Sequence, residues 1–397
     1  MKRFLFFIGF VSSICCHAQN NKPEIIQLVN SSSYGHELKL SDIAKQITYI
    51  PLETKDNCLI GNRYDVYLSK EFIFVNSGGI IFQFTSKGKF IRQVNVNGQG
   101  PGEGSAYSMT IDEDSQMIYI RLLNSRGILV FNTEGKYIRT ITEPFRKGPY
   151  GSTIISFYKG HLLFPFTNDD GQNPYKYAIV DTKGEVIHSE VNYEKVFVKM
   201  NIMILIMNKI PQFHFNNLSC FFKQEYNDTI FRIKDDFRGV PEYILKLDKQ
   251  LTREDVMKSY ATSPPRTNEI SGKNEILGVA ASDTYLDIYH TYRAYDKDNK
   301  KRFFSRYNKQ TRQLLQNVNL QIVNDWDGGM DVKMEYGYQQ GSVFCFPIQP
   351  FEMKEVLTNT HFSKAQAKFP EQKEALKTLV NNLIEDDNPV LMLIHLK

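Results

Sequence analysis

The sequence predicts an all-β protein that folds as a β-propeller. The segment Gly88–Arg92, GKFIR, returns as Gly135–Arg139, GKYIR, after 47 residues, and Phe84 returns as Phe131 at the same spacing. Repeats of about 40–50 residues made of short strands are typical of propellers, in which each repeat forms one blade. Aromatic residues make up 13% of the chain, with 28 Phe and 22 Tyr but one Trp. Phe and Tyr favour half-buried pleated sheet.

Two blades are clear in the sequence and a third is looser. The stretch Phe72–Gly104 alternates strands with glycine turns at 76–79 and 85–88, and it ends in a glycine-rich loop. The second blade covers Tyr107–Ile141 with four short strands. The third covers residues 153–189 and repeats the same kind of turn as Asp181-Thr182-Lys183-Gly184.

The C-terminal half predicts further strands and one charged surface segment. A wholly apolar run at 202–207 is too short to span a membrane and predicts a buried strand. The charged segment 249–271 contains two consecutive prolines and predicts a surface excursion with one helical turn at 252–258. The remaining predicted strands are 219–223, 229–233, 243–247, 285–292, 302–307, 313–317 and 342–347.

A helix is predicted at Pro370–Glu385, inserted before a last strand at Val390–Leu396. Its apolar residues fall at i, i+3, i+4 and i+7, and Pro370 suits a first helical turn. A propeller commonly closes its ring by completing one blade with strands from both ends of the chain. We therefore expect the strand at Ile47–Leu52 to share a blade with Val390–Leu396, or to occupy a strand adjacent to it.

The N-terminus predicts export. Residues 1–18 form a signal peptide with a basic start and a short apolar segment, residues 19–37 form a loose polar leader, and residues 38–397 form the propeller. Small residues before Gln19 suit cleavage by signal peptidase I. In the alternative, Cys15 or Cys16 is a lipidated lipoprotein cysteine. The expected location is therefore the periplasm or cell envelope, with membrane contact only through such an anchor.

Charge and cysteine content exclude some classes of function. The net charge is +4 with both signs interspersed, which predicts no nucleic-acid partner. Cleavage before Gln19 leaves Cys58, Cys220 and Cys345, and no two cysteines form a C-x-x-C pair, so we expect buried free thiols. The eight histidines are scattered and form no metal-binding motif.

Several stretches, taken together, resemble a known family. They are LSDIAKQITYIPLET (40–54), GKFIRQVNVNGQGPGE (88–103), EYNDTIFRI (225–233), NDWDGG (324–329) and EDDNPVLMLIHLK (385–397). The chain resembles the secreted six-bladed β-propellers of Bacteroidetes, which are similar in pattern to NHL-repeat propellers and largely uncharacterised. The resemblance implies six blades, export and often a lipid anchor, and it supplies no catalytic residues.

The glycine-rich loop at 98–104 is the first candidate site. It lacks the third glycine of the dinucleotide fingerprint and the Gly-Lys-Ser/Thr of a Walker A motif, and no helix follows it. An interblade loop in which glycine supplies positive φ is the favoured interpretation. Such loops often border the central channel of a propeller, so this one remains a candidate lining of a ligand site.

Seven residues are candidate ligand contacts. Trp326 lies between Asp325 and Asp327 and suits stacking on a sugar ring, but the favoured alternative is that Trp326 packs into a blade interface. Tyr226 and Asn227 have the same two interpretations. The set is completed by two residues of the second blade, Tyr107 and Arg121.

The sequence therefore favours a monomeric binding or interaction module for a glycan, small metabolite or protein. No catalytic motif is present. The alternative is a metal-dependent hydrolase, lactonase or lyase on the same scaffold, with a divalent cation held by residues from different blades. The fold alone does not choose between the two.

Overall fold

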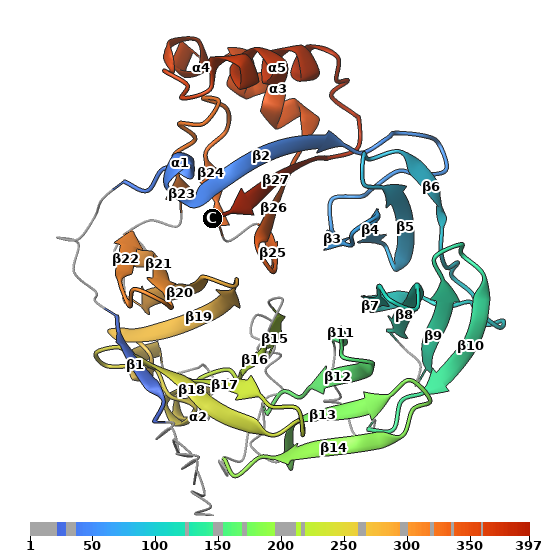
Figure 1. Ribbon diagram of the computed structural model, residues 1–397, viewed down its shortest axis with the longest axis vertical. Helices are drawn as coiled ribbons and strands as arrows, with labels where there is room; N and C mark the ends of the chain where they lie inside the picture. The colour runs from blue at the N-terminus through green and yellow to red at the C-terminus, as the bar shows by residue number, and fades with distance from the viewer. Residues whose placement is uncertain are drawn as a thin grey trace, which may run out of the picture.

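A computed structural model shows six sheets arranged in a ring around a central axis (Figure 1). The β-propeller fold and its six blades are thus confirmed. The residues that the structure describes are 22–28, 37–123, 127–145, 154–168, 173–194, 212–215, 219–260, 267–293, 301–317, 321–334, 337–358 and 360–397.

The first three blades are antiparallel four-stranded sheets formed by consecutive segments. Blade 1 contains β3 (Tyr64–Leu68), β4 (Phe72–Ser77), β5 (Ile80–Thr85) and β6 (Phe90–Gln93). Blade 2 contains β7 (Ala106–Asp112), β8 (Met117–Leu122), β9 (Gly127–Asn132) and β10 (Tyr137–Thr142). Blade 3 contains β11 (Ser156–Tyr158), β12 (His161–Pro165), β13 (Tyr175–Asp181) and β14 (Val186–Val191).

The other three blades depart from this simple order. Blade 4 contains β15 (Gln212–Phe215), β16 (Cys220–Lys223), β17 (Thr229–Ile233), β18 (Gly239–Lys246) and the N-terminal β1 (Glu24–Gln27). Blade 5 contains β19 (Lys273–Ala281), β20 (Tyr285–Arg293), β21 (Lys301–Asn308) and β22 (Leu314–Asn317). Blade 6 contains β25 (Tyr338–Gln340), β26 (Val343–Ile348), β27 (Val390–Leu396) and β2 (Ala44–Pro51). A two-stranded ribbon, β23 (Gln321–Ile322) and β24 (Val332–Lys333), precedes blade 6.

The sequence repeat has a physical basis in the outer hairpin of blades 1 and 2. Gly88 and Gly135 both have positive φ, +79° and +80°, and a Cβ at Gly88 would lie 2.2 Å from the carbonyl oxygen of Pro51. The repeated aromatic residues make equivalent edge contacts, Phe84 with Phe90 at 5.8 Å and Phe131 with Tyr137 at 5.7 Å between ring centroids. The repeat therefore encodes a tight turn together with an aromatic pair that packs the hairpin.

The ring closes in blade 6 through strands from the two ends of the chain, as predicted. β2 pairs antiparallel with β27 along its length, from Ala44 opposite Leu396 to Pro51 opposite Val390. β27 is almost fully buried and also pairs with β26, so the C-terminal strand lies inside the blade and the N-terminal strand forms its outer edge.

The predicted loose leader is wrong for residues 24–27. They form β1, which adds a fifth strand to blade 4 and runs parallel to β18. Ile26 and the following Leu28 are each 2% exposed and pack among the apolar residues between blades 4 and 5. Burial of these two side chains stabilises a short strand that the polar surroundings of the segment obscured in the sequence.

Helices interrupt blade 6 and the connection from blade 4 to blade 5. Helix α5 (Pro370–Asn381) confirms the predicted helix and ends four residues earlier than expected, and α3 (Pro350–Thr358) and α4 (Thr360–Lys364) precede it. The predicted turn at 252–258 is the helix α2 (Arg253–Tyr260), and a short α1 (Leu40–Ile43) leads into β2. None of the helices in the described part of the chain is long and apolar enough to cross a membrane.

Two differences in the strands have clear reasons. The inner strand β19 was not predicted, and its pairing with β20 shifts register between Ile276 and Gly278, which breaks the alternation that marks a strand. The predicted strand at 202–207 lies outside the described residues.

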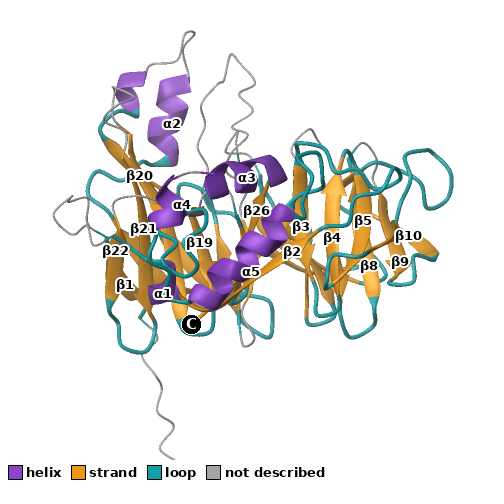
Figure 2. Ribbon diagram, turned by 90° about the horizontal axis from the view of Figure 1, so that it is seen from above, coloured by secondary structure: helices purple, strands orange, loops and turns teal. Residues whose placement is uncertain are grey.

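Helices α2 and α3 stand at one end of the ring, which we call the upper end (Figure 2).

Candidate functional site

A polar pocket of about 470 Å³ opens at the upper end, between blades 6 and 1. It lies beside β3 and β25, the inner strands of these two adjacent blades (Figure 1). The segment that leads into α3 also borders it. Its lining residues are Asn62, Arg63, Tyr64, Asp65, Asn76, Gly78, Gly79, Tyr338, Pro347 and Gln349.

Hydrogen bonds between blades hold the walls of this pocket. The Tyr338 hydroxyl donates to the carbonyl oxygen of Tyr64 at 2.6 Å, and the Gln349 side-chain amide donates to the Tyr64 hydroxyl at 3.4 Å. On the other side, the Asn76 amide donates to the carbonyl of Tyr107 at 3.3 Å and so joins blade 1 to blade 2. The pocket is therefore a product of three blades, and its shape depends on their packing.

Two charged side chains line the pocket without a partner among the described residues. In the described part of the chain, the side chains of Arg63 and Asp65 form no hydrogen bond and no ion pair. Desolvation raises the pKa of Asp65 although water reaches its carboxylate, because the pocket walls surround it. Desolvation raises the pKa of Tyr338 to about 12, with a further contribution from the nearby negative charge of Asp65.

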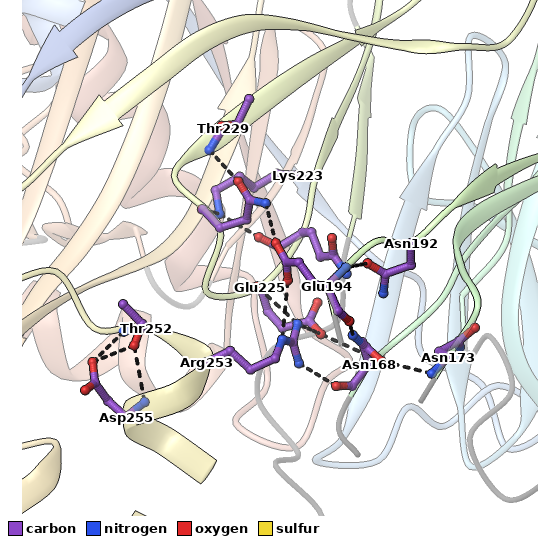
Figure 3. Close-up of polar contacts among 12 residues, drawn as sticks. Asn168, Asn173, Asn192, Glu194, Lys223, Glu225, Thr229, Thr252, Arg253 and Asp255 are labelled. Atoms are coloured by element: carbon purple, nitrogen blue, oxygen red, sulfur yellow. Dashed lines mark hydrogen bonds and ion pairs between the residues drawn. The ribbon is translucent and has the colours of Figure 1, made fainter. Parts of the chain in front are cut away.

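A second polar assembly lies where blades 3 and 4 meet α2, which stands at the upper end (Figure 2), and Figure 3 shows its polar contacts. We call it the Arg253 cluster, and it consists of Asn168, Glu194, Lys223, Glu225, Asn227 and Arg253. Its members come from three connecting segments, from the last residue of β16 and from α2. The spacing of these residues in the sequence therefore could not reveal the cluster.

Arg253 is the centre of this cluster. Its guanidinium contacts the Glu225 carboxylate at 2.9 Å and the Glu194 carboxylate at 3.5 Å, and it also donates to the carbonyl of Asn168. Arg253 is 6% exposed and Glu225 is 7% exposed. The same oxygen of Glu225 accepts the backbone N–H of Asn168 at 3.2 Å. The buried charges thus neutralise each other and fix α2 against blades 3 and 4.

Lys223 adds a buried ammonium to the cluster. It donates to the carbonyls of Gln224 and Asn227, which tie the turn after β16 to the strand. Burial lowers the pKa of Lys223 to about 8, although Glu225 and other nearby carboxylates oppose this shift.

The predicted ligand residues Tyr226 and Asn227 lie in this cluster. Tyr226 has φ of +56°, a sparsely populated conformation for a tyrosine, and its ring lies 5.6 Å from the guanidinium carbon of Arg253. The Asn227 amide donates to Glu194 at 2.8 Å, and its oxygen accepts the N–H of Thr229 at 2.8 Å. Both residues therefore contribute to the turn and to the packing of the cluster.

The predicted residues of blade 2 separate into two roles. Arg121 is 5% exposed and forms an ion pair with Glu143 at 3.1 Å, and its guanidinium carbon lies 6.0 Å from the Tyr107 ring centroid. Tyr107 contacts the residue Asn76 of the pocket through its carbonyl. Arg121 thus serves an internal ion pair, whereas Tyr107 supports a pocket wall.

Trp326 and its flanking aspartates attach the C-terminal helices to the ring. The Trp326 ring is 6% exposed and lies 4.3 Å from the Phe369 ring, between centroids. Asp327 is fully buried and accepts the Tyr49 hydroxyl at 2.9 Å, and Asp325 accepts both the N–H and the hydroxyl of Ser41. These contacts match the packing interpretation rather than a sugar-stacking platform.

The glycine-rich loop at 98–104 contains its own anion. The Glu103 carboxylate accepts the N–H of Gly100 at 2.9 Å, and a Cβ at Gly98 would lie 2.0 Å from that carboxylate. A side chain of the protein thus occupies the position that a phosphate would take. The loop connects β6 to β7, as expected for an interblade connection.

Cysteines and metal ligands add no further site. Cys58, Cys220 and Cys345 are buried free thiols, as predicted. In the ranges that the structure describes, no three His, Cys, Asp or Glu side chains are grouped so that they could hold a metal ion. The candidate lipidation residues Cys15 and Cys16 lie outside the described residues.

Sequence reasoning missed the charged pair of the pocket. Arg63 and Asp65 flank Tyr64 at the start of an inner strand, where a side chain lies near the axis of a propeller. Opposite charges at this position, beside the glycine turn at 76–79, are the signal that could have identified them.

Comparisons with known proteins agree with this architecture. The model of a family described as a domain of unknown function, DUF4934, matches residues 23–395. A predicted exported protein of Bacteroides fragilis NCTC 9343 has a similar structure, with 16% sequence identity, a TM-score of 0.67 and coverage of 94% of this chain and 99% of that one. A member of the DUF4221 family from Bacteroides vulgatus is similar at 10% identity and a TM-score of 0.50, over 89% of this chain and 97% of that one.

These likenesses to solved structures concern the fold, since the identities are low. A search of curated proteins gives no match. The family match extends from the strand that joins blade 4 almost to the end of the strand that closes blade 6, and so includes every blade. The chain belongs to the DUF4934 family.

Proposed function

We propose that this protein is an exported binding module that holds a small polar ligand in the pocket between blades 6 and 1. The observation that carries the proposal is the convergence of polar side chains on an open volume of about 470 Å³, among them Arg63 and Asp65, which form no ion pair within the described part of the chain. Ligand sites are typically concavities of about 300–1,000 Å³ with a few convergent polar groups. The other polar assembly at the upper end, the Arg253 cluster, uses its charges internally.

Export fits the predicted signal peptide and the likeness to a predicted exported protein of Bacteroides fragilis. Lipidation at Cys15 or Cys16 is the alternative to soluble release. In either case β1 runs parallel to β18, whose last residues lie beside the turn at Asp228 at the upper end. β1 therefore begins toward the lower end, and a tether attached at that end would leave the pocket open to the surroundings.

A steric block of the pocket tests this proposal. Gly78 lines the pocket with φ of +62°, and a Cβ there would meet no atom within 4 Å. Asparagine tolerates this backbone conformation, so Gly78→Asn places a side chain in the pocket at little cost in stability. Gly160→Asn is the matched control, since Gly160 has φ of +79° and equal space in a turn of blade 3 outside the pocket.

The measurement is a thermal-shift screen of the wild type against sugars, amino acids and small organic acids, followed by calorimetric titration of the hits. We expect Gly78→Asn to reduce the affinity for the hits at least about tenfold and Gly160→Asn to leave it unchanged. Hits that bind Gly78→Asn as well as they bind the wild type would place the site elsewhere and refute the proposal.

A further inference from the structure

The pocket contains two opposite charges that remain apart. Arg63 directly precedes β3, and Asp65 is the second residue of that strand. Both line the same cavity. Among the described residues they form no ion pair with each other and none with a third group. Both groups are exposed to solvent at the pocket, whereas the buried Arg121 is paired with Glu143. A ligand with two charges of its own would complete this arrangement.

From this we infer that the pocket binds a zwitterionic ligand of the amino-acid class, with its ammonium at Asp65 and its carboxylate at Arg63. The inference rests on the proposed binding function of the same pocket. Guanidinium groups match carboxylates in a bidentate geometry, and a carboxylate beside aromatic rings suits an ammonium group. Tyr64 and Tyr338 supply such rings.

The two charges together disfavour other ligand classes. A simple cation would be attracted by Asp65 and repelled by Arg63, and a simple anion would meet the reverse pattern. A neutral sugar would leave both charges without a counter-ion. A free amino acid or the two ends of a short peptide satisfy both, and the side chain of Asn62 lines the same pocket beside a polar side chain of the ligand.

The test uses chemical removal of one ligand charge at a time. The probes are the twenty free amino acids and a set of dipeptides, titrated calorimetrically into the wild-type protein. For the tightest probe, the methyl ester lacks the carboxylate charge and the N-acetyl form lacks the ammonium charge. We expect each capped form to bind at least about tenfold more weakly than the free zwitterion.

Two variants connect these losses to the residues. In Asp65→Asn, we expect the preference for the free amine over the N-acetyl form to disappear. In Arg63→Gln, we expect the preference for the free acid over the ester to disappear. Each variant keeps the other preference, which a general loss of structure would not produce, and the wild-type comparison alone decides the question if a variant fails to fold.

The outcomes separate this inference from the proposed function. Capped and free forms that bind equally would overturn the zwitterion assignment. Sugars that bind the wild type and are blocked in Gly78→Asn would overturn it too, but would leave the proposed binding function in place. No binding by any sugar, amino acid, dipeptide or small organic acid would overturn both.

Discussion

The pocket between blades 6 and 1 and the Arg253 cluster lie at the same end of the ring, and they use charge differently. In the cluster, Arg253 forms ion pairs with Glu225 and Glu194, so its buried charge is balanced inside the protein. In the pocket, Arg63 and Asp65 face open volume with no protein partner among the described residues. The difference indicates which polar groups hold the blades together and which are available to a ligand.

The largest effect is expected from breaking the cluster. Arg253→Met removes one partner of a buried ion pair and leaves Glu225 buried without its counter-charge. The free energy of unfolding should fall by about 3–5 kcal/mol, measured by urea denaturation. The matched variant Arg63→Met should change it by less than about 0.5 kcal/mol. Equal losses in the two variants would show that the two regions do not differ in the way we describe.

A smaller effect, dependent on pH, is expected from the cluster lysine. The pKa of Lys223 is about 8 in the folded protein and 10.5 is its ordinary value. Between these values the unfolded chain binds more protons than the folded chain, so the stability of the wild type rises with pH. The contribution of Lys223 is on the order of 3 kcal/mol at most.

Lys223→Met should lack this rise. The measurement is the urea midpoint of the wild type and the variant at about pH 7.5 and about pH 10, between which most of the rise lies. Lys87→Met, at an exposed lysine in the β5–β6 turn, is the control and should follow the wild type. A Lys223→Met profile that parallels the wild type would mean that the ammonium is well solvated.

The smallest effect on stability is expected in the pocket. Because the pKa of Asp65 is raised, its charged form is disfavoured in the folded protein above the ordinary value of 3.8. Asp65→Asn should therefore leave the free energy of unfolding at pH 7 within about 0.5 kcal/mol of the wild type, with any change toward higher stability. A large destabilisation in the same urea assay would show that Asp65 stabilises the fold and is not held available for a ligand.

Much of the fold follows from local patterns in the sequence. The repeated GK-aromatic-IR turn identifies the outer hairpins because a glycine with positive φ and an aromatic pair are needed there. Val390–Leu396 and its partner β2 were predictable because a propeller must remove its open edge. β1 was not predictable, because its short sequence in polar surroundings is stabilised as a strand by pairing with β18 of blade 4. β19 was not predictable either, because the register shift before Gly278 breaks its alternating pattern.

The site was harder to predict because its residues meet only in three dimensions. Tyr226 and Asn227 are recognisable in the sequence as a polar turn, but their partners Arg253 and Glu194 lie in α2 and in the segment after β14. Trp326 stood out as the single tryptophan, yet it packs α5 against the ring through Phe369. Whether a charge is paired depends on neighbours from other blades, and the sequence does not reveal that for Asp65.

The closure of the ring in blade 6 determines when this protein can finish folding. β27 lies between β26 and β2, so until Val390–Leu396 is available blade 6 lacks its third strand and the outer strand β2 has no partner in the blade. Contacts between segments this distant in sequence form slowly, because a long loop must close first. Blades 1 to 5 can therefore collapse early, but the ring is completed only after Val390–Leu396 has joined blade 6.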